Sequence, residues 1–553
     1  EITTQLVPDQ PPIDEILTEL ANLPIDVFFE ESFKQLGLRD PDEMIVKGFG
    51  EMFNLPNDQF TNISDAYIRE TQRMQSGILD LLHTYDLSEL SPSQKRSYEV
   101  YEWYLDGLVR GHEFMYYDYP VNSMSIWGKQ NWVIDFMVNH QPITDIDSAE
   151  NYIARLSNLN TWTEQLLEGL KLREEAGVVP PKFLIEESIN QVERHLFMRG
   201  NDSYYAERVE LYTSFRQKLN SVDGLTNSEK QDLLDRALDE IEQTFIPAFL
   251  ELREYLLYLE TIASSKAGLD QYPHGEEYYA YKLHVETGTD LSTEQIHELG
   301  LSEVARIRED MLLAGAQLGY TEEMDIAELQ GYLQSESEAL GGNALLEKFH
   351  ALIDRVSHVS ETYFDHLPAA ELVIHDEPFG SGIGYYVSPP LGGSGPGIFY
   401  TNINQDLPIY LISTYVFHET IPGHHLQIAL AQELDLPTFR RVLVFNFYAE
   451  GWALYAENLA EEMGLYEDDP FGNLGRLDFE LARAARLVVD TGIHAKGWSR
   501  TEAARYYQEA TGRSSEPIAM NRYVILPGQG CGYTIGHLRL LALRQKAMDQ
   551  LGD

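Results

Sequence analysis

The sequence predicts a large, mainly α-helical protein that carries one small β-sheet. Long stretches on both sides of residue 300 place apolar residues at the i, i+3, i+4, i+7 spacing of amphipathic helices. Only residues 371–402 change texture, with many Gly, Pro, Tyr and β-branched residues, which is typical of short strands and turns. No Pro/Ser-rich linker or internal repeat divides the 553 residues, which are enough for a large buried core.

In chain order, residues 1–24 contain "PDQPPIDEI" and are expected to form an irregular arm. Residues 25–285 are expected to form a helical N-terminal lobe, with "IDSAENYIARLSNLNTWTEQLLEGL" as a clear example of helical periodicity. Residues 286–553 are expected to form the catalytic lobe. It opens with a helix at which Ser292 and Gln295 have the spacing of a capping box. The two lobes are expected to pack as one continuous domain.

The segment 371–402 is predicted to hold two or three short strands, with a Gly-Ser-Gly-Pro-Gly turn at 393–397. The strand "PGIFYTN", residues 396–402, is a candidate edge strand that could pair with an extended peptide through main-chain hydrogen bonds. The alternative interpretation is a short structural hairpin, which is common in proteins.

The net charge of the chain is −49, from 89 acidic and 40 basic residues. Nucleic acid and anionic membrane surfaces would be repelled by this excess, so neither is expected as a partner. The acidic residues are scattered along the chain, which is typical of a strongly solvated surface. No apolar run approaches the ~18 residues of a membrane-spanning helix, and the single cysteine, Cys531, excludes an internal disulfide.

The stretch "HETIPGHH", residues 418–425, resembles a zinc-protease motif that has been interrupted. Two histidines share one zinc ion from a regular helix when they stand at i and i+4, as in HExxH. Here position i+4 from His418 is Pro422. In an unbroken helix His424 would lie roughly 120° around the axis from His418, and His425 about 10.5 Å along it.

Pro422 and Gly423 remove this objection, because proline interrupts a helix and glycine accepts unusual backbone angles. A two-residue excursion at this pair would return His424 to His418, whereas His425 would need three extra residues. Glu419 then occupies the position of a general base beside the first ligand. The alternative is that these are unrelated histidines at a helix end.

The next helical segment, "NFYAEGWALYAENLAEE", supplies a candidate third ligand. Glu450 lies within an apolar stretch where an unpaired carboxylate would be costly, and a metal ion would offset that cost. Gly451 would let the two helices approach closely. Glu457, seven residues on and on the same face, is a weaker candidate that could support a ligand from outside. A solvated surface charge is the alternative for Glu450.

Four segments in this order, "HETIPGHHLQ", "YAEGWALYAE", "VVDTGIHAKGWS" and "LPGQGCGYTIG", resemble the bacterial family called domain of unknown function 885. The resemblance spans roughly residues 25–545. It implies an HExxPGH metallopeptidase fold with one Zn²⁺ held by His418, His424 and Glu450, and with Glu419 as the base.

Many members of this family are described as lipoproteins. The chain begins at Glu1 without a methionine, which suits a trimmed tag or a removed leader. We therefore expect an exported, periplasmic or cell-envelope protein with a lipid anchor on the removed segment. A cytoplasmic location is the alternative.

The fold is expected to be of the gluzincin type and to be similar to the helical zinc peptidases of the thimet-oligopeptidase and angiotensin-converting-enzyme groups. Those peptidases stabilise the oxyanion with a tyrosine and a histidine from late in the chain. By analogy, Tyr533 is the first candidate here and His494 the second, with Asp490 orienting His494. Arg522 is a candidate for holding a substrate carboxylate. The alternatives are an ordinary core tyrosine and a structural Asp–His pair.

These residues predict a zinc hydrolase that cleaves short peptides. Two other functions remain open at this point. One is hydrolysis of a non-peptide amide, and the other is a non-catalytic envelope protein whose metal is structural or absent. A structural metal site has no use for a base at Glu419, and this favours the enzyme.

Overall fold

The computed structural model describes residues 11–50, 52–124, 127–196, 204–320, 324–377, 384–391 and 395–552. It is mainly helical, as the sequence predicts, and it has two small sheets where the sequence predicts one. The chain forms two compact units: Glu1–Lys266 with Pro437–Phe439, and Ala267–Leu436 with Arg440–Asp553. The boundary thus falls between Lys266 and Ala267, whereas the sequence analysis placed it between residues 285 and 286. The reason is that the helix Gly275–Thr287 packs on late helices of the second unit.

The first unit is entirely helical in the described residues. Several of its helices bury apolar faces in one core, which includes Trp162, Phe215 and Phe249. Its helices are α1 (Ile13–Leu20), α2 (Ile25–Gly37), α3 (Pro41–Val46), α4 (Asp65–Leu82), α5 (Pro92–Gly111), α6 (Lys129–Asp135), α7 (Ile146–Ser157), α8 (Leu159–Glu175), α9 (Lys182–His195), α10 (Glu210–Asn220), α11 (Asn227–Glu240) and α12 (Ile246–Ile262).

The sequence analysis expected an irregular arm over residues 1–24, and this was wrong for the part of the arm that the structure describes, residues 11–24. Residues 1–10 lie outside the described residues, but α1 begins at Ile13, directly after Pro12. Ile13, Ile16 and Leu20 share one face of this helix and are buried, while Leu17 lies against Gly77 of α4. The prolines before this segment start the helix rather than prevent it, because proline is tolerated at a helix N-terminus.

The second unit holds the candidate site. Its helices are α13 (Gly275–Thr287), α14 (Thr293–Gln317), α15 (Ile326–Glu336), α16 (Gly342–Ser360), α17 (Ile409–Glu419), α18 (Leu430–Glu433), α19 (Thr438–Val442, shared with the first unit), α20 (Asn446–Glu462), α21 (Pro470–Ala495), α22 (Arg500–Thr511), α23 (Asn521–Ile525) and α24 (Gln529–Leu551). The predicted capping box of Ser292 and Gln295 at the start of α14 is confirmed.

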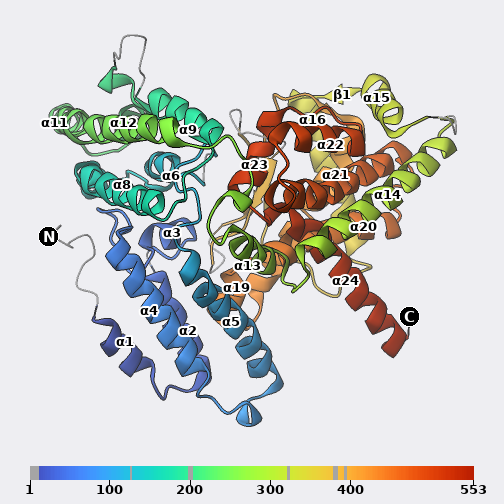
Figure 1. Ribbon diagram of the computed structural model, residues 1–553, viewed down its shortest axis with the longest axis horizontal. Coiled ribbons are helices and arrows are strands. Elements are labelled where there is room, and N and C mark those ends of the chain that lie inside the picture. The colour runs from blue at the N-terminus through green and yellow to red at the C-terminus, as the bar shows by residue number, and fades with distance from the viewer. Residues whose placement is uncertain are drawn as a thin grey trace. The chain divides into compact units, whose positions relative to one another are not determined.

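Helix α21 is the centre of this unit. Nearly every position from Leu474 to His494 is buried, which is typical of a helix surrounded by others. It packs against α14, α17, α22 and α24, and α14 runs beside it (Figure 1). Polar side chains on such a helix face neighbouring helices rather than water, so the role of each is judged from its hydrogen-bond and ion-pair partners.

Two glycines bring α20 against α24. A Cβ atom on Gly451 would lie 2.6 Å from the backbone of Gly536, and one on Gly536 would meet the Phe447 carbonyl oxygen. The close approach that the sequence predicted at Gly451 is therefore made to α24, the helix of Tyr533, and not to the motif helix α17.

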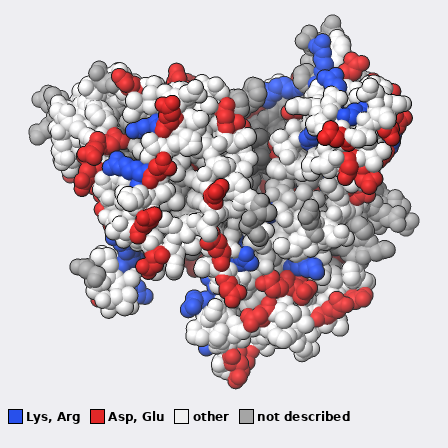
Figure 2. Space-filling model, turned by 180° about the vertical axis from the view of Figure 1, so that it is seen from behind, with Lys and Arg blue, Asp and Glu red and all other residues white. Residues whose placement is uncertain are grey.

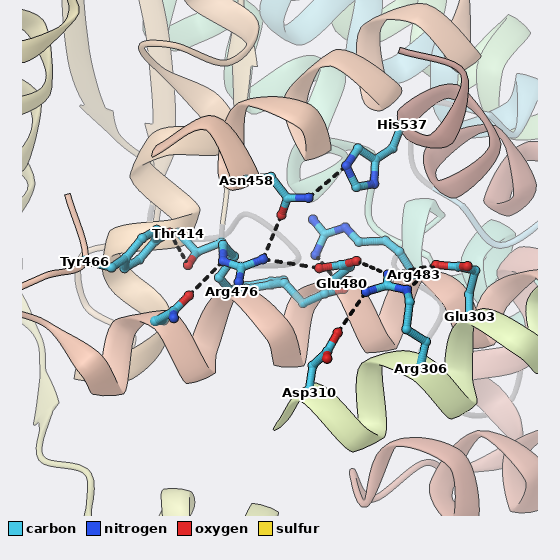
Figure 3. Close-up of polar contacts among 12 residues, drawn as sticks. Glu303, Arg306, Asp310, Thr414, Asn458, Tyr466, Arg476, Glu480, Arg483 and His537 are labelled. Atoms are coloured by element: carbon cyan, nitrogen blue, oxygen red, sulfur yellow. Dashed lines mark hydrogen bonds and ion pairs between the residues drawn. The ribbon is translucent and has the colours of Figure 1, made fainter. Parts of the chain in front are cut away.

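A polar network also fixes α20 against α24 and α21 (Figure 3). The Asn458 amide donates to Nε2 of His537 on α24, 2.9 Å away, and accepts from Arg476 of α21 at 2.7 Å. Glu480 accepts from Arg476 at 3.3 Å and from Arg306 of α14 at 2.6 Å. These bonds connect α20 to α24 and α21, and through α21 to α14. They therefore restrict rotation of α20 about its axis and fix the direction in which Glu450 and Glu457 point.

The sheet beside α17 has the strand order β2–β4–β3, from β2 (Leu372–Asp376), β3 (Gly384–Val387) and β4 (Gly397–Thr401). A second pair joins β1 (Ala339–Leu340) and β5 (Leu407–Pro408). Phe399 of β4 packs on Phe349 of α16 and Tyr415 of α17. Three strands are thus confirmed, while residues 393 and 394 of the predicted turn lie outside the described residues.

The prediction that 396–402 is an edge strand was wrong. Strand β4 is central, with β2 parallel on one side and β3 antiparallel on the other. Its backbone groups are therefore paired within the protein and are not free to bind an extended peptide. The buried residues of β4 are Gly397, Phe399 and Thr401, as expected for a strand that covers α17.

The acidic excess lies on the surface in scattered form. On the face drawn in Figure 2, acidic side chains are spread over much of the surface with basic ones between them. No described helix is both long and apolar enough to cross a bilayer.

Candidate metal centre

Three predicted ligands converge between α17 and α20. Nε2 of His418 and Nε2 of His424 each lie 3.6 Å from Oε2 of Glu450. One donor atom from each residue lies within 4.8 Å of the other two, and the two imidazole rings are 4.9 Å apart and nearly perpendicular. A separation of 3.6 Å is too long for a hydrogen bond, so the three groups face one another without bonding.

The donor set fits a zinc ion. Two ligands at ~2.1 Å in tetrahedral geometry stand about 3.4 Å apart, close to the separation seen here, and two histidines with one glutamate form a known hydrolytic ligand set. His424 Nδ1 is buried without a hydrogen-bond partner among the described residues. The facing Nε2 and carboxylate atoms thus make no hydrogen bonds with one another, which suits groups that could hold a cation.

The chain makes the required bend directly after α17. This helix ends at Glu419, and the chain turns through residues 420–423, where the Ile421–Pro422 peptide bond is cis. The indole of Trp452 donates to the Pro422 carbonyl at 2.8 Å, which ties the turn to α20.

The need for glycine at position 423 is spatial. Gly423 does not adopt a positive φ. A Cβ atom there would instead clash with the carbonyl oxygens of Phe417 and His418. The turn thus folds back against the end of α17, and this brings His424 beside His418.

Glu457 holds His418 from behind. Its Oε1 lies 2.7 Å from Nδ1 of His418, and its side chain is 2% exposed. Because Nδ1–H is donated to this carboxylate, Nε2 keeps its lone pair toward the centre of the site. Arg483 of α21 lies 3.9 Å from the same carboxylate.

The carboxylates of Glu450 and Glu457 affect the protonation of His418. Burial alone lowers its pKa, but Glu450 and Glu457 raise it, with a net value of about 9. In the absence of metal, His418 therefore carries a second proton, on Nε2, at neutral pH. Metal binding has to displace this proton, so metal affinity is expected to fall with pH below about 9.

Replacing Glu457 by Gln is expected to weaken metal binding about 10- to 100-fold, because an outer partner of a histidine ligand orients the ring and raises its basicity. Competition titration against a chelator of known affinity measures the change. Glu461→Gln is the matched control, since Glu461 lies one turn further along α20 on the exposed surface. Equal affinities for the two variants would show that Glu457 has no role in the site.

Glu419 is buried at the last position of α17. Burial raises the pKa of its carboxyl, while the neighbouring His418 and His424 oppose the rise. It is not one of the three converging groups, so its carboxylate is free for another role.

Tyr533, at the start of α24, is buried, and the charge of Glu450 adds to burial in raising its pKa. The structure therefore places a neutral phenol near the third ligand, at the position where the sequence predicted an oxyanion donor.

The other predicted residues lie differently. His494 is buried, and its Nε2 contacts the Tyr523 carbonyl at 2.8 Å. Asp490 accepts hydrogen bonds from Tyr279 and from the Gly528 amide, and not from His494. The predicted orienting pair is thus absent: Asp490 instead fixes the glycine turn before α24, and His494 has a structural partner.

Two further candidates also have partners of their own. Arg522 is exposed and donates to Gln529 at 3.1 Å. His425 points away from the triad and lies 3.0 Å from the Tyr386 hydroxyl, and burial lowers its pKa to about 4, so that it stays neutral.

Two arginines near the site were missed by the sequence analysis. Arg483 and Arg486 lie on α21, and both place their guanidinium over the ring of Tyr533. A signal for them exists in "LARAARLVV", residues 481–489, where two arginines interrupt a run that is otherwise apolar. Cations in such a helix are rarely solvated and need an anionic partner.

Comparisons with known proteins place the chain in a family. The family model described as "Bacterial protein of unknown function (DUF885)" matches residues 41–553. A putative lipoprotein of Colwellia psychrerythraea has a similar crystal structure, with a TM-score of 0.86, 28% identity, and coverage of 98% of this chain and 94% of that one.

A putative lipoprotein of unknown function from Shewanella oneidensis shares the fold at a TM-score of 0.72 and 15% identity, with 96% and 94% of the two chains covered. No curated protein matches the sequence.

Proposed function

This chain belongs to the DUF885 family of bacterial proteins, and we propose that it is a zinc-dependent metallopeptidase that hydrolyses short peptides. One observation carries the proposal: His418 of α17, His424 after the turn that follows α17, and Glu450 of α20 converge, while Glu419, adjacent to the first of them, stays outside the ligand set. This combination suits hydrolysis, because a hydrolytic zinc site has three protein ligands and a separate base.

A zinc ion held by these three residues would supply the electrophile that lowers the pKa of water and polarises the substrate carbonyl. Glu419 takes the proton of the attacking water and delivers it to the leaving amine. Its burial supports this role, since a raised pKa makes a carboxyl a better base and a usable acid near neutral pH. Tyr533 donates a hydrogen bond from its hydroxyl to the oxyanion that forms on the carbonyl.

A purely structural metal site fits these features less well. Structural zinc sites are usually closed by four protein ligands, whereas three groups converge among the described residues. Retention of Glu419 in a buried position would also be costly without a use.

We also propose an exported location at the cell envelope. The two solved structures named above are described as putative lipoproteins, and each aligns with nearly the whole chain. Detection of the protein in a membrane-associated periplasmic fraction of the native cell would support this location, and its recovery from the cytoplasm alone would oppose it.

The two adjacent histidines provide a direct test of the metal centre. We expect one zinc ion per chain in the wild type and in His425→Ala, but little or none in His424→Ala, because only His424 faces Glu450. Elemental analysis of protein dialysed against metal-free buffer measures this.

A peptide library, with and without chelator, tests the activity. Cleavage that is lost on chelation and restored by zinc is the expected result. Metal retention by His424→Ala, or no cleavage of any peptide by the zinc-loaded wild type, would contradict the proposal.

A further inference from the structure

Two cations of α21 meet the candidate oxyanion donor. The Arg486 guanidinium carbon lies 4.8 Å from the centre of the Tyr533 ring, and that of Arg483 lies 5.8 Å from it. The two arginines are three residues apart and so share one face of the helix. Their cations and the Tyr533 ring form one cluster, which we call the arginine cluster.

The two arginines differ in their partners. Arg483 donates to the Phe479 carbonyl at 3.4 Å and lies 3.9 Å from Glu457, so it belongs to the support of the metal centre. Arg486 makes no hydrogen bond and no ion pair with any described residue, and its Nε is buried. Its five N–H donors are therefore unused by the protein, apart from the stacking on Tyr533.

An unpaired guanidinium in a partly buried position costs free energy unless an anion completes it. The cluster lies close to the metal centre, because Arg483 lies 3.9 Å from Glu457, which in turn holds the Nδ1 atom of His418. Glu450 itself faces the two histidines and does not pair with Arg486. The anion that completes Arg486 is thus absent from the described residues, and the substrate can supply it.

We propose that Arg486 binds a carboxylate of the peptide substrate, which makes this protein a peptidase that selects peptides by a carboxylate close to the cleaved bond. This inference rests on the proposed function. The planar guanidinium fork matches a carboxylate through two parallel hydrogen bonds. Arg522, which the sequence suggested for this role, is exposed and already bonded to Gln529.

The carboxylate has two sources, the C-terminus of a peptide and an Asp or Glu side chain. Short acetylated peptides in matched pairs separate them: a free C-terminal acid against the amide, and Asp against Asn at each position. An acid preference that follows the C-terminal pair identifies a C-terminal carboxylate, and one that follows the Asp/Asn pair identifies a side chain. Either result supports the carboxylate site, whereas equal kcat/KM within every pair overturns it.

The Arg486→Gln variant tests the residue. We expect the wild type to favour the carboxylate form in kcat/KM by about 10- to 100-fold, as for a hydrogen bond between charged groups. Arg486→Gln should remove this preference, because it should lower kcat/KM for the carboxylate form more than for the uncharged form. Arg522→Gln, the matched control, should keep the preference.

A purely structural arginine would behave differently. In that case Arg486→Gln would slow both members of a pair alike, or leave the preference unchanged, and either result overturns the inference. Thermal unfolding and zinc content of each variant show whether the fold and the metal site are intact.

A binding measurement separates this inference from the proposed function. Calorimetry of zinc-loaded Glu419→Gln with the same peptide pairs needs no turnover. Tighter binding of the carboxylate form, lost on adding Arg486→Gln, supports the carboxylate site even if the wild type cleaves none of the peptides. Equal binding of both forms, or no binding, overturns the site even if hydrolysis is observed.

Discussion

Replacing Glu419 by Gln is expected to reduce peptide hydrolysis by about 10²- to 10⁴-fold, the usual contribution of a positioned general base. The amide keeps the size of the carboxyl but cannot take a proton. Since Glu419 lies outside the converging donor set, the variant should still bind one zinc ion per chain. The loss should therefore appear in kcat, with the metal content unchanged.

Glu461→Gln is the matched control, because it removes one glutamate charge from the exposed surface of α20 and should hydrolyse peptides at the wild-type rate. Measurement of kcat alongside zinc stoichiometry distinguishes the outcomes. A Glu419→Gln variant with full zinc content and wild-type kcat would rule out Glu419 as the base. A variant that loses zinc would show instead that Glu419 supports the metal.

The geometry of the metal centre follows from the sequence to a large extent, because helix periodicity restricts it. His418 and His424 cannot share an ion in a regular helix, so the Pro422–Gly423 pair has to bend the chain if they are ligands at all. The structure brings together His418, His424 and Glu450, and turns His425 away. The relative position of His418 and His424 was thus accessible from the sequence, because it depends only on the spacing of neighbouring residues.

Features that depend on pairing distant segments were not accessible. Strand β4 is central because it pairs in parallel with β2, which precedes it in the chain by a long connection, and no local pattern specifies that order. His494 and Asp490 stand at helical i, i+4 spacing, yet each found a partner on another segment, the Tyr523 carbonyl and Tyr279. Hydrogen-bond partners of buried polar groups are set by tertiary packing, which one sequence does not show.

The arginine cluster falls between these cases. Its residues were visible as charges on an apolar helix, but its meaning depends on Arg486 having no partner in the folded protein. Such a residue stands out only when the contacts of its neighbours are known. Arg483, three residues earlier, has the same sequence context and is occupied by Glu457.

Gly423→Ala is expected to disrupt the metal centre more than any change outside the ligands. The added Cβ would clash with the carbonyl oxygens of Phe417 and His418, which are backbone atoms at the end of α17. The turn has to move away from the helix, and His424 moves with it. Because metal–ligand distances tolerate only about ±0.2 Å, zinc affinity should fall by more than the roughly 10- to 100-fold typical of losing an outer partner.

Gly331→Ala is the matched control, since a Cβ there meets nothing within 4 Å on the exposed surface of α15. Alanine is the better helix former by roughly 0.5–1 kcal/mol, so this variant should keep its zinc and unfold at the same or a slightly higher temperature. Competition titration and thermal unfolding of both variants make the comparison. Wild-type zinc affinity in Gly423→Ala would mean that the turn can hold His424 beside His418 without touching α17. The close approach at position 423 would then not be what forms the site.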